Sequence, residues 1–282
     1  MPTNSFREKI LHLYWFSGSG NTLAVSEAFA KRLRELGWIV ELRPLERSDP
    51  AELDSNAIFA IAFPTHCFSI PEIVRRFVYA LPQQTNPTPA LMLGTPGALS
   101  GGVCGPMKRL LATKGFRCDF GRIFMMPDSF FPYTGEKVNQ KIRNHTFRQV
   151  EHYAEKFDAG QTRWPRWPIL ADVCGWICGT FFAMRKYCKM FHTTIHANKT
   201  QCTRCGICVA HCPTNALEQK TSEEIPVANL NCTNCLRCVA VCPANAMKHC
   251  LGFHAYRNEP AEQLQAKFPA NQSSVKLPME PE

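Results

Sequence analysis

The sequence predicts an α/β protein in which a doubly wound, five-stranded parallel sheet is followed by a small, cysteine-rich α+β domain. Two observations support this fold class. Between residues 10 and 160, short apolar runs alternate with segments of helical periodicity, as strands and helices do in a parallel sheet with right-handed crossovers. Between residues 202 and 247, one cysteine spacing occurs twice, which indicates an internal repeat.

Five strands and four helices are expected in the first 160 residues. Ile10–Phe16 is an apolar strand, and the helix after it continues until Gly37. Ala57–Phe63 is continuously apolar, so we expect it near the centre of the sheet. The other elements are strands at Trp38–Arg43, Ala90–Thr95 and Arg122–Met126, and helices at Pro71–Leu81, Gly105–Gly115 and Gly135–Asp158.

The composition is that of a folded protein, with 45% hydrophobic and 20% charged residues. Fifteen cysteines would suit a secreted disulfide scaffold, but eight of them lie within residues 202–242 at metal-ligand spacing, which requires reduced thiols. The N-terminal residues MPTNSFREKI contain no apolar signal-peptide core. We therefore expect a cytoplasmic protein.

The net charge of +9 is concentrated in a connector, residues 161–200, which carries six basic residues and one acidic residue. No nucleic-acid partner is expected, because the sequence lacks the interleaved aromatic and basic residues of a known binding module. The apolar stretch 169–184 contains Asp172 and is shorter than the roughly 20 residues of a membrane span. We expect a helix packed between the domains; a helix lying on a membrane surface, through residues 163–189, is the less favoured alternative.

The cysteine repeat has the form C-x₂-C-x₂-C-x₃-C-P. Three thiolates of such a run bind one cubane, and the fourth cysteine ligates the other cluster. One [4Fe–4S] cluster is thus predicted on Cys202, Cys205, Cys208 and Cys242, and a second on Cys232, Cys235, Cys238 and Cys212. Two structural zinc sites are the alternative, although zinc prefers separated CxxC pairs. The segment resembles a bacterial two-cluster ferredoxin domain.

The loop after the first strand is built from small polar residues: Ser17, Gly18, Ser19, Gly20, Asn21 and Thr22. It lacks the lysine of a Walker P-loop and the third glycine of a dinucleotide fingerprint. Backbone N–H groups and hydroxyls at a helix N-terminus suit a phosphate dianion. An ordinary capped turn is the alternative interpretation.

These residues match the flavodoxin signature [ST]-x-[ST]-G-N-T, and residues 10–158 resemble the flavodoxin family. The resemblance implies that the loop holds the 5′-phosphate of FMN and that the sheet order is 2-1-3-4-5. It also implies two loops beside the flavin ring, which contribute Pro64, Thr65, His66, Cys67 and Phe68 after the third strand, and Thr95, Pro96, Gly97, Gly101 and Gly102 after the fourth. Phe130 and Phe131 are either core or flavin contacts, and His66, Cys67 and Asp128 are the candidate catalytic groups.

Both halves together resemble the flavodoxin–ferredoxin fusion family. The expected domains are a flavodoxin-like FMN-binding domain at residues 1–160, a helical linker at 161–198, a two-cluster ferredoxin domain at 199–250 and a polar surface tail at 251–282.

The implied function is electron transfer between the two clusters, FMN and an external redox protein, such as a ferredoxin, another flavoprotein or an oxidoreductase. The alternative is an FMN-dependent reductase of a small organic acceptor that receives its electrons through the clusters. A third interpretation, a sensor whose clusters control a partner interaction, leaves the phosphate loop without a role.

Overall fold

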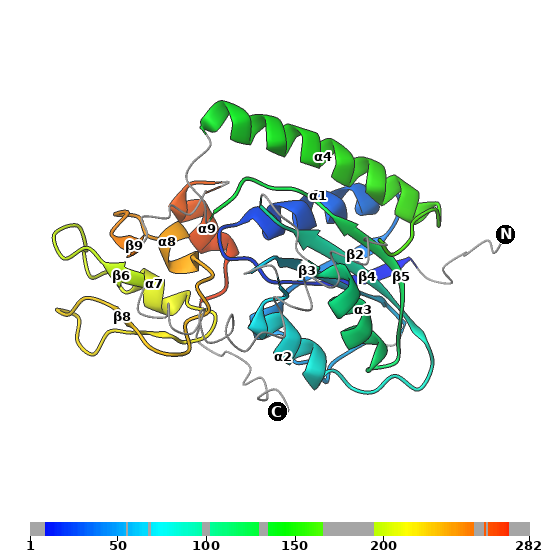
Figure 1. Cartoon of the computed structure of the whole chain (residues 1–282), viewed down its shortest axis with the longest axis horizontal. Helices are drawn as coiled ribbons and strands as arrows, with labels where there is room; N and C mark the ends of the chain where they lie inside the picture. Colours follow the sequence, from blue (N-terminus) through cyan, green and yellow to red (C-terminus); the bar gives the residue numbers. More distant parts are fainter. Residues whose placement is uncertain are drawn as a thin grey trace.

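A computed structural model of the chain describes residues 9–54, 56–66, 69–97, 102–129, 135–165, 195–250, 257 and 259–270. Figure 1 shows a twisted sheet with helices on both faces and a smaller part, formed by the cysteine repeat, at one end of it.

The sheet contains β1 (Ile10–Trp15), β2 (Ile39–Pro44), β3 (Ile58–Pro64), β4 (Thr88–Thr95) and β5 (Phe116–Ile123). All neighbouring strands are parallel, and their order is β2-β1-β3-β4-β5. This order confirms the predicted flavodoxin-like topology. In such sheets the chain reverses its winding between β1 and β3, and ligands bind beyond the carboxyl ends of the strands at that point.

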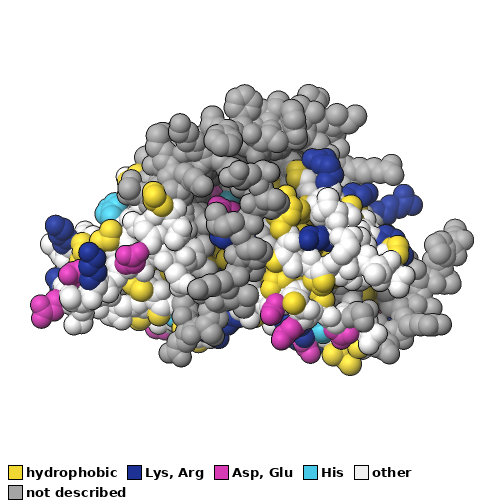
Figure 2. Space-filling model, turned by 90° about the horizontal axis from the view of Figure 1, so that it is seen from below, with side chains coloured by type: hydrophobic (Ala, Val, Ile, Leu, Met, Phe, Trp, Pro, Cys, Tyr) yellow, Lys and Arg dark blue, Asp and Glu magenta, His cyan; other side chains and the backbone are white. Residues whose placement is uncertain are grey.

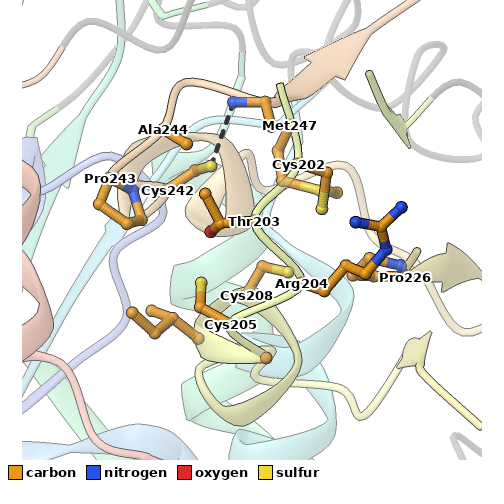
Figure 3. A pocket seen from close by; sticks show the side chains of 13 residues that line it. Cys202, Thr203, Arg204, Cys205, Cys208, Pro226, Cys242, Pro243, Ala244 and Met247 are labelled. Carbon is orange, nitrogen blue, oxygen red and sulfur yellow. Dashed lines mark hydrogen bonds between the residues drawn. The ribbon is translucent and has the colours of Figure 1, made fainter. Parts of the chain in front are cut away.

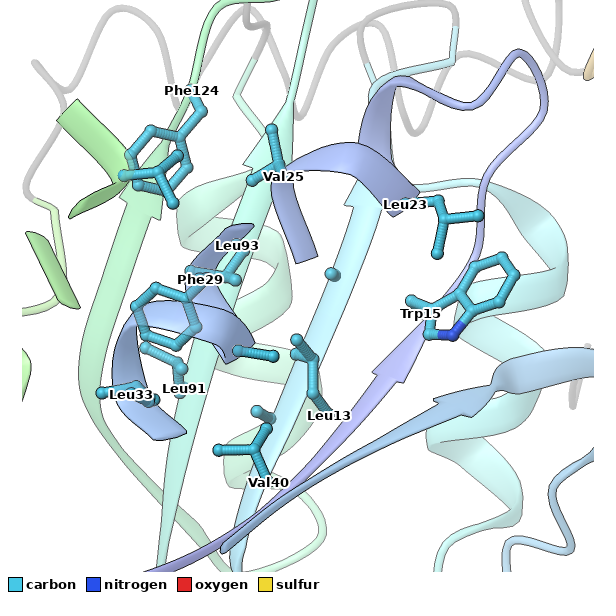
Figure 4. Close-up of a cluster of buried hydrophobic side chains, with 14 of the residues drawn as sticks. Leu13, Trp15, Leu23, Val25, Phe29, Leu33, Val40, Leu91, Leu93 and Phe124 are labelled. Atoms are coloured by element: carbon cyan, nitrogen blue, oxygen red, sulfur yellow. The ribbon is translucent and has the colours of Figure 1, made fainter. Parts of the chain in front are cut away.

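Helices cover both faces of the sheet. α1 (Asn21–Glu35) and α4 (Glu136–Asp158) lie on one face, and α2 (Glu72–Ala80) and α3 (Cys104–Ala112) lie on the other (Figure 1). A short 3₁₀ helix, η1 (Leu45–Arg47), follows β2. Leu13, Phe29 and Leu91 are fully buried between the sheet and α1 (Figure 4). Each such side chain contributes about 1.5–3 kcal/mol by leaving water, so this core fixes the end of β1 where the phosphate loop begins.

The fifth strand differs from its prediction. We predicted Arg122–Met126, whereas β5 spans Phe116–Ile123. The strand lies at the edge of the sheet and has exposed residues such as Arg117, so it lacks the continuous apolar run of a central strand. The apolar residues Phe124 and Met126 are buried in the loop beyond it, which is why the pattern pointed to the wrong segment.

The cysteine repeat folds into two similar halves. Its secondary structure consists of β6 (Ile195–Ala197), α7 (Ile207–Ala210), β7 (Leu217–Glu218), β8 (Val227–Ala228), α8 (Arg237–Ala240) and β9 (Met247–His249). The strands form an antiparallel sheet in the order β7-β8-β6-β9. This arrangement agrees with the predicted small α+β domain.

Left-handed backbone occurs at equivalent positions of the two halves. The pairs are Arg204 with Asn234, Gly206 with Leu236, and Asn215 with Asn245, and all six have φ between 50° and 71°. The first two pairs lie in the cysteine loops, next to Cys205 and Cys235. Arg204 and Leu236 are neither Gly nor Asn, so each adopts this conformation at a cost of about 1–2 kcal/mol.

The segment after the repeat is more than a surface tail in its described part. Within the range 251–282, α9 (Ala261–Lys267) buries Leu264, and Phe268 follows it into the same core. The core they join contains Trp15 of β1 together with Ala240 and Val241 at the end of α8. α9 therefore packs against both the sheet and the cysteine repeat, a role that the polar composition of the segment did not indicate.

The apolar stretch 169–184, and with it most of the predicted linker, lies outside the described residues. The described part of the connector includes Trp164, which is buried and donates its indole N–H to the carbonyl oxygen of Cys104 at 3.0 Å. No helix in the described part of the chain is long and apolar enough to span a membrane.

Candidate cofactor sites

The first cysteine site gathers residues from both halves of the repeat. Cys202, Cys205 and Cys208 of the first motif and Cys242 of the second line one pocket (Figure 3). The loop from Cys202 to Cys208 wraps around the pocket, and Gly206, with φ of 71°, makes the turn that starts α7. The four thiols that the spacing assigned to one cluster thus lie together.

The second cysteine site is the counterpart of the first. The electrostatic neighbours of Cys238 include Cys235, Cys232 and Cys212, so the last cysteine of the first motif lies among the first three of the second. Cys238 also interacts with Cys208 of the other group, which places the two sites next to each other.

Buried thiols in both groups have raised pKa values. Burial raises the pKa of Cys208 to about 12, and the neighbouring thiols Cys242, Cys205 and Cys202 contribute to this rise. Burial and the surrounding thiols also hold the pKa of Cys238 well above its usual range. Four thiolates cannot share an apolar pocket without a compensating positive charge. Ferric and ferrous ions of a cluster would supply it.

Backbone amides complete the sulfur environment. The N–H of Ala246 donates to Cys242 Sγ at 3.2 Å, and the N–H of Ala216 donates to Cys212 Sγ at the same distance. Such bonds stabilise thiolate ligands and tune cluster potentials. Among the described residues, no group of three or more His, Cys, Asp or Glu side chains is arranged to hold a single metal ion. The gathered thiols and the amides that donate to them have the chemistry that the predicted clusters require.

The phosphate loop lies between β1 and α1. Gly20 has φ of 95° and precedes the first residue of α1, a conformation that favours glycine. Its N–H donates to Ser17 Oγ at 3.1 Å. The first turn of α1 contains no acidic residue, and its first amides have no intrahelical acceptor. The loop thus offers N–H donors and the positive end of a helix dipole, as a phosphate dianion requires.

The hydroxyls and amide of this loop reach the end of β4 and the loop after β5. Thr22 Oγ1 and Thr95 Oγ1 are hydrogen-bonded at 2.6 Å, and Ser19 Oγ and Ser129 Oγ at 2.8 Å. Asn21 Nδ2 donates to the carbonyl oxygen of Pro127 at 2.8 Å. Each hydroxyl has one donor and two acceptor positions, so these pairs can also bond a phosphate oxygen.

The predicted ring-flanking residues lie at or after the carboxyl ends of β3 and β4 where the structure describes them. Pro64 ends β3, followed by Thr65 and His66, and Thr95 ends β4, followed by Pro96 and Gly97. Gly102 is buried just before α3. Cys67, Phe68, Gly101, Phe130 and Phe131 lie outside the described residues.

Two of the candidate catalytic residues have a described environment. His66 exchanges backbone hydrogen bonds with Ser69 at 3.0 and 2.8 Å, and its ring lies 6.1 Å from that of Phe16. Burial lowers the pKa of His66 to about 4, so the imidazole is neutral at pH 7. A Cβ placed on Gly97 would lie 2.6 Å from Asp128 Cγ. Asp128 therefore packs against the loop after β4.

Sequence reasoning missed the residues that join the two halves of the chain. Arg237 is fully buried, and its Nε and Nη2 donate to the carbonyl oxygen of Ser17 at 3.0 and 2.7 Å. Its Nη1 bonds to Glu46, which is also buried. One signal was present in the sequence: Arg237 stands where the first copy of the repeat has the apolar Ile207.

A second missed contact lies at the phosphate loop itself. A Cβ added to Gly18 would collide with the carbonyl oxygen of Cys235 and would lie 2.9 Å from its carbonyl carbon. Gly18 is thus packed directly against the second cysteine motif. The flavodoxin signature leaves this position unspecified, so the motif gave no reason to expect a glycine there.

Comparison with known proteins assigns the cysteine repeat. Residues 194–243 match the family described as 4Fe-4S dicluster domain. The match confirms that iron–sulfur cofactors of the [4Fe–4S] type were correctly predicted for this segment. No curated protein matches the chain.

Solved structures similar to the chain include two flavodoxins. The flavodoxin of Streptococcus pneumonia TIGR4 is 17% identical over 53% of this chain and 98% of its own, with a TM-score of 0.39. The two-electron reduced flavodoxin of Megasphaera elsdenii is 17% identical over 52% and 98% of the two chains, with a TM-score of 0.38. The flavodiiron core of Flv1 from Synechocystis sp. PCC6803 is 18% identical over 56% and 37%, with a TM-score of 0.38.

The parallel sheet of order 2-1-3-4-5 and the matched cysteine repeat together agree with the resemblance to the flavodoxin–ferredoxin fusion family. The chain joins an N-terminal flavodoxin-like fold to a C-terminal 4Fe-4S dicluster domain.

Proposed function

We propose that this protein transfers electrons between two [4Fe–4S] clusters and an FMN bound in the same chain, and exchanges them with an external redox protein. A flavodoxin-like fold combined with a 4Fe-4S dicluster domain indicates electron transfer. Iron–sulfur clusters carry single electrons, whereas a flavin holds one or two. Such a chain can collect single electrons and release them as pairs. Because the clusters need reduced thiols, we propose that it works in the cytoplasm.

The residues that would hold the cofactors are those of the three sites. Residues 17–22 and the N-terminus of α1 would bind the FMN phosphate, with the loops after β3 and β4 beside the ring. Crossed ligation would hold one cluster on the first three cysteines of the first motif with Cys242, and the other on the first three of the second motif with Cys212.

The contact between Gly18 and Cys235 carries the proposal. It brings a cluster ligand of the second motif against the loop that would bind the flavin phosphate. Cys235 is also partly buried against the core that underlies α2 and α3. The rate of electron tunnelling falls steeply with distance, so packing of the second cysteine motif on the flavin loop favours transfer. Covalent tethering keeps the effective concentration high.

Gly18→Ala tests this function. The φ of Gly18 lies outside the left-handed region, so alanine fits the backbone, but its methyl group would push the second motif away from the loop. Anaerobically purified wild type should contain FMN and about eight irons. The variant should keep its irons, and with FMN supplied at a saturating concentration its flavin should be reduced more slowly by a reduced ferredoxin in stopped-flow measurements. Equal rates would contradict transfer through this contact, and wild type without flavin or iron would contradict the function itself.

The alternative function is reduction of a small organic acceptor by the FMN. Residues 64–69 and 95–102 contain no Trp or Tyr, the residues expected to stack on a flavin ring, which favours a ring face open to a substrate. The two functions differ in how the anaerobically reduced protein is reoxidised. Saturable turnover with one quinone or nitroaromatic compound supports the reductase, and rapid reoxidation only by carrier proteins supports electron transfer.

A further inference from the structure

The buried arginine of the second cysteine motif touches the phosphate loop. Arg237 has no exposed surface. Two of its nitrogens, Nε and Nη2, converge on the carbonyl oxygen of Ser17, the first residue of the loop. Its guanidinium carbon lies 4.5 Å from the ring centroid of Phe268 and 5.5 Å from that of Phe16. The guanidinium group is therefore held in one orientation by aromatic rings and hydrogen bonds.

This contact sets the direction of a peptide group in the loop. A trans peptide is planar, so its C=O and N–H point in opposite directions. When Arg237 holds the carbonyl of Ser17, it also fixes the direction of the Gly18 N–H, one of the amides of the phosphate loop. It also keeps the negative end of the Ser17 carbonyl on Arg237 and away from an anion.

The charge of Arg237 cannot itself attract the phosphate strongly. Glu46 bonds to Nη1 and is only 3% exposed, so the buried pair has no net charge. Any effect of Arg237 on an anion in the loop must then come from the way it orients the Ser17–Gly18 peptide group. Lysine keeps the charge but lacks the planar fork that reaches one acceptor with two nitrogens, which makes Arg237→Lys an informative variant.

We propose that Arg237 is a positioning residue for the phosphate group of FMN, so that the flavin site of the N-terminal fold is completed by the iron–sulfur domain. This inference rests on the proposed function, because it presupposes that residues 17–22 bind the FMN phosphate. Coupling between sites is reciprocal. FMN in the loop therefore also stabilises the docked position of α8 and the second cysteine motif.

The test compares FMN with riboflavin, which lacks the phosphate. The full chain is prepared anaerobically with its iron–sulfur sites intact and its flavin removed, and each flavin is titrated by fluorescence quenching. We expect Arg237→Lys and Arg237→Met to weaken FMN binding about tenfold to a hundredfold, the usual effect of losing hydrogen bonds to a charged group. Riboflavin affinity should change less than about threefold, within the range of indirect effects.

Arg257→Met is the matched control. Arg257 is another arginine that binds the backbone near α8: its Nη2 donates to the carbonyl oxygens of Val239 and Cys242 at 2.7 and 3.1 Å. Neither of these bonds involves the phosphate loop. We expect the Arg257→Met protein to bind FMN like wild type. A loss equal to that of the Arg237 variants, or equal losses of FMN and riboflavin, would show general damage and overturn the proposal.

A measurement on wild type covers variants that fail to fold. Amide hydrogen exchange over residues 235–242 should become slower when FMN binds and remain unchanged with riboflavin. Exchange that is indifferent to FMN overturns the inference. If wild type binds FMN no more tightly than riboflavin, the phosphate loop has been misassigned and the proposed function fails first.

Discussion

The buried ion pair between Glu46 and Arg237 should dominate the stability of the interface between the two parts of the chain. The two side chains are 3% and 0% exposed. Arg237→Met leaves a carboxylate in the interior without its counter-charge, and Glu46→Leu leaves a guanidinium in the same state. Each single change should lower the free energy of separating the domains by about 3–5 kcal/mol.

The double variant should recover most of this loss. With both charges gone, the remaining defect is the Ser17 carbonyl, which loses two donors, at about 1–3 kcal/mol. The two effects should therefore be strongly non-additive, with a coupling energy of at least about 3 kcal/mol.

Native-state hydrogen exchange of the α9 amides measures the free energy of separating the two domains, because α9 packs on the interface between them. Arg32→Met, in an exposed ion pair with Glu155, is the control and should leave the opening of α9 unchanged. Two results would contradict this prediction. Either the α9 amides of the Arg237→Met protein exchange as slowly as in wild type, or the free energy lost by the double variant equals the sum of the losses of the two single variants.

Five other substitutions test the sites and the docked helix. Cys242→Ala should damage the cluster of the first motif, and Cys212→Ala that of the second, as resolved by the EPR signals of the two clusters; the reverse assignment would rule out crossed ligation. Thr22→Asp should lower the FMN content of purified protein by placing a negative charge beside the phosphate, and unchanged content would count against the loop assignment. Burial lowers the pKa of His66 from an ordinary 6.5 to about 4 in the folded protein. Between these pH values the unfolded state binds a proton at His66 and the folded state does not. The free energy of unfolding therefore falls as the pH falls from 6.5 to 4. In that window, His66→Gln should reduce the slope of the unfolding free energy against pH by up to about 1.4 kcal/mol per pH unit. An unchanged dependence of the urea midpoint on pH would contradict this prediction. Leu264→Ala should lower the free energy of unfolding by about 2–5 kcal/mol and speed proteolysis between the domains. Resistance to proteolysis equal to that of wild type would mean that α9 does not hold the domains together.

The central strands and the cysteine groups could be predicted because their signals are local. β3 is buried on both faces, so its sequence is continuously apolar, and the doubled cysteine run contains its own ligand assignment. The order of the sheet followed from the alternation of strands and helices together with the flavodoxin signature. Where burial is uneven, as at the edge strand β5, the same apolar pattern placed the strand too late in the chain.

The interface between the two parts could not be predicted because each of its contacts depends on residues far apart in sequence. Arg237 and Ser17 are 220 residues apart, and the sequence around neither residue indicates the other as its partner. Phe268 follows a polar helix, and only the assembled fold shows that it packs on Trp15 at a ring distance of 6.2 Å. Long-range packing of this kind leaves no periodic pattern in the chain.

The two copies of the repeat nevertheless diverge where their surroundings differ. Gly206 and Ile207 of the first copy correspond to Leu236 and Arg237 of the second, and both replacements are buried in the second copy. The middle cysteines differ in the same sense: Cys205 is exposed, whereas Cys235 is partly buried and touches Gly18.

Acidic and basic side chains are interspersed at the outer end of the cysteine-repeat domain (Figure 2), so this face is solvated. Two chemically equal ligand sets thus occupy unequal positions, one facing solvent and one facing the phosphate loop. Because a docked surface selects different residues from a solvated one, positions at which two copies of a repeat differ indicate which copy is docked and through which side chains.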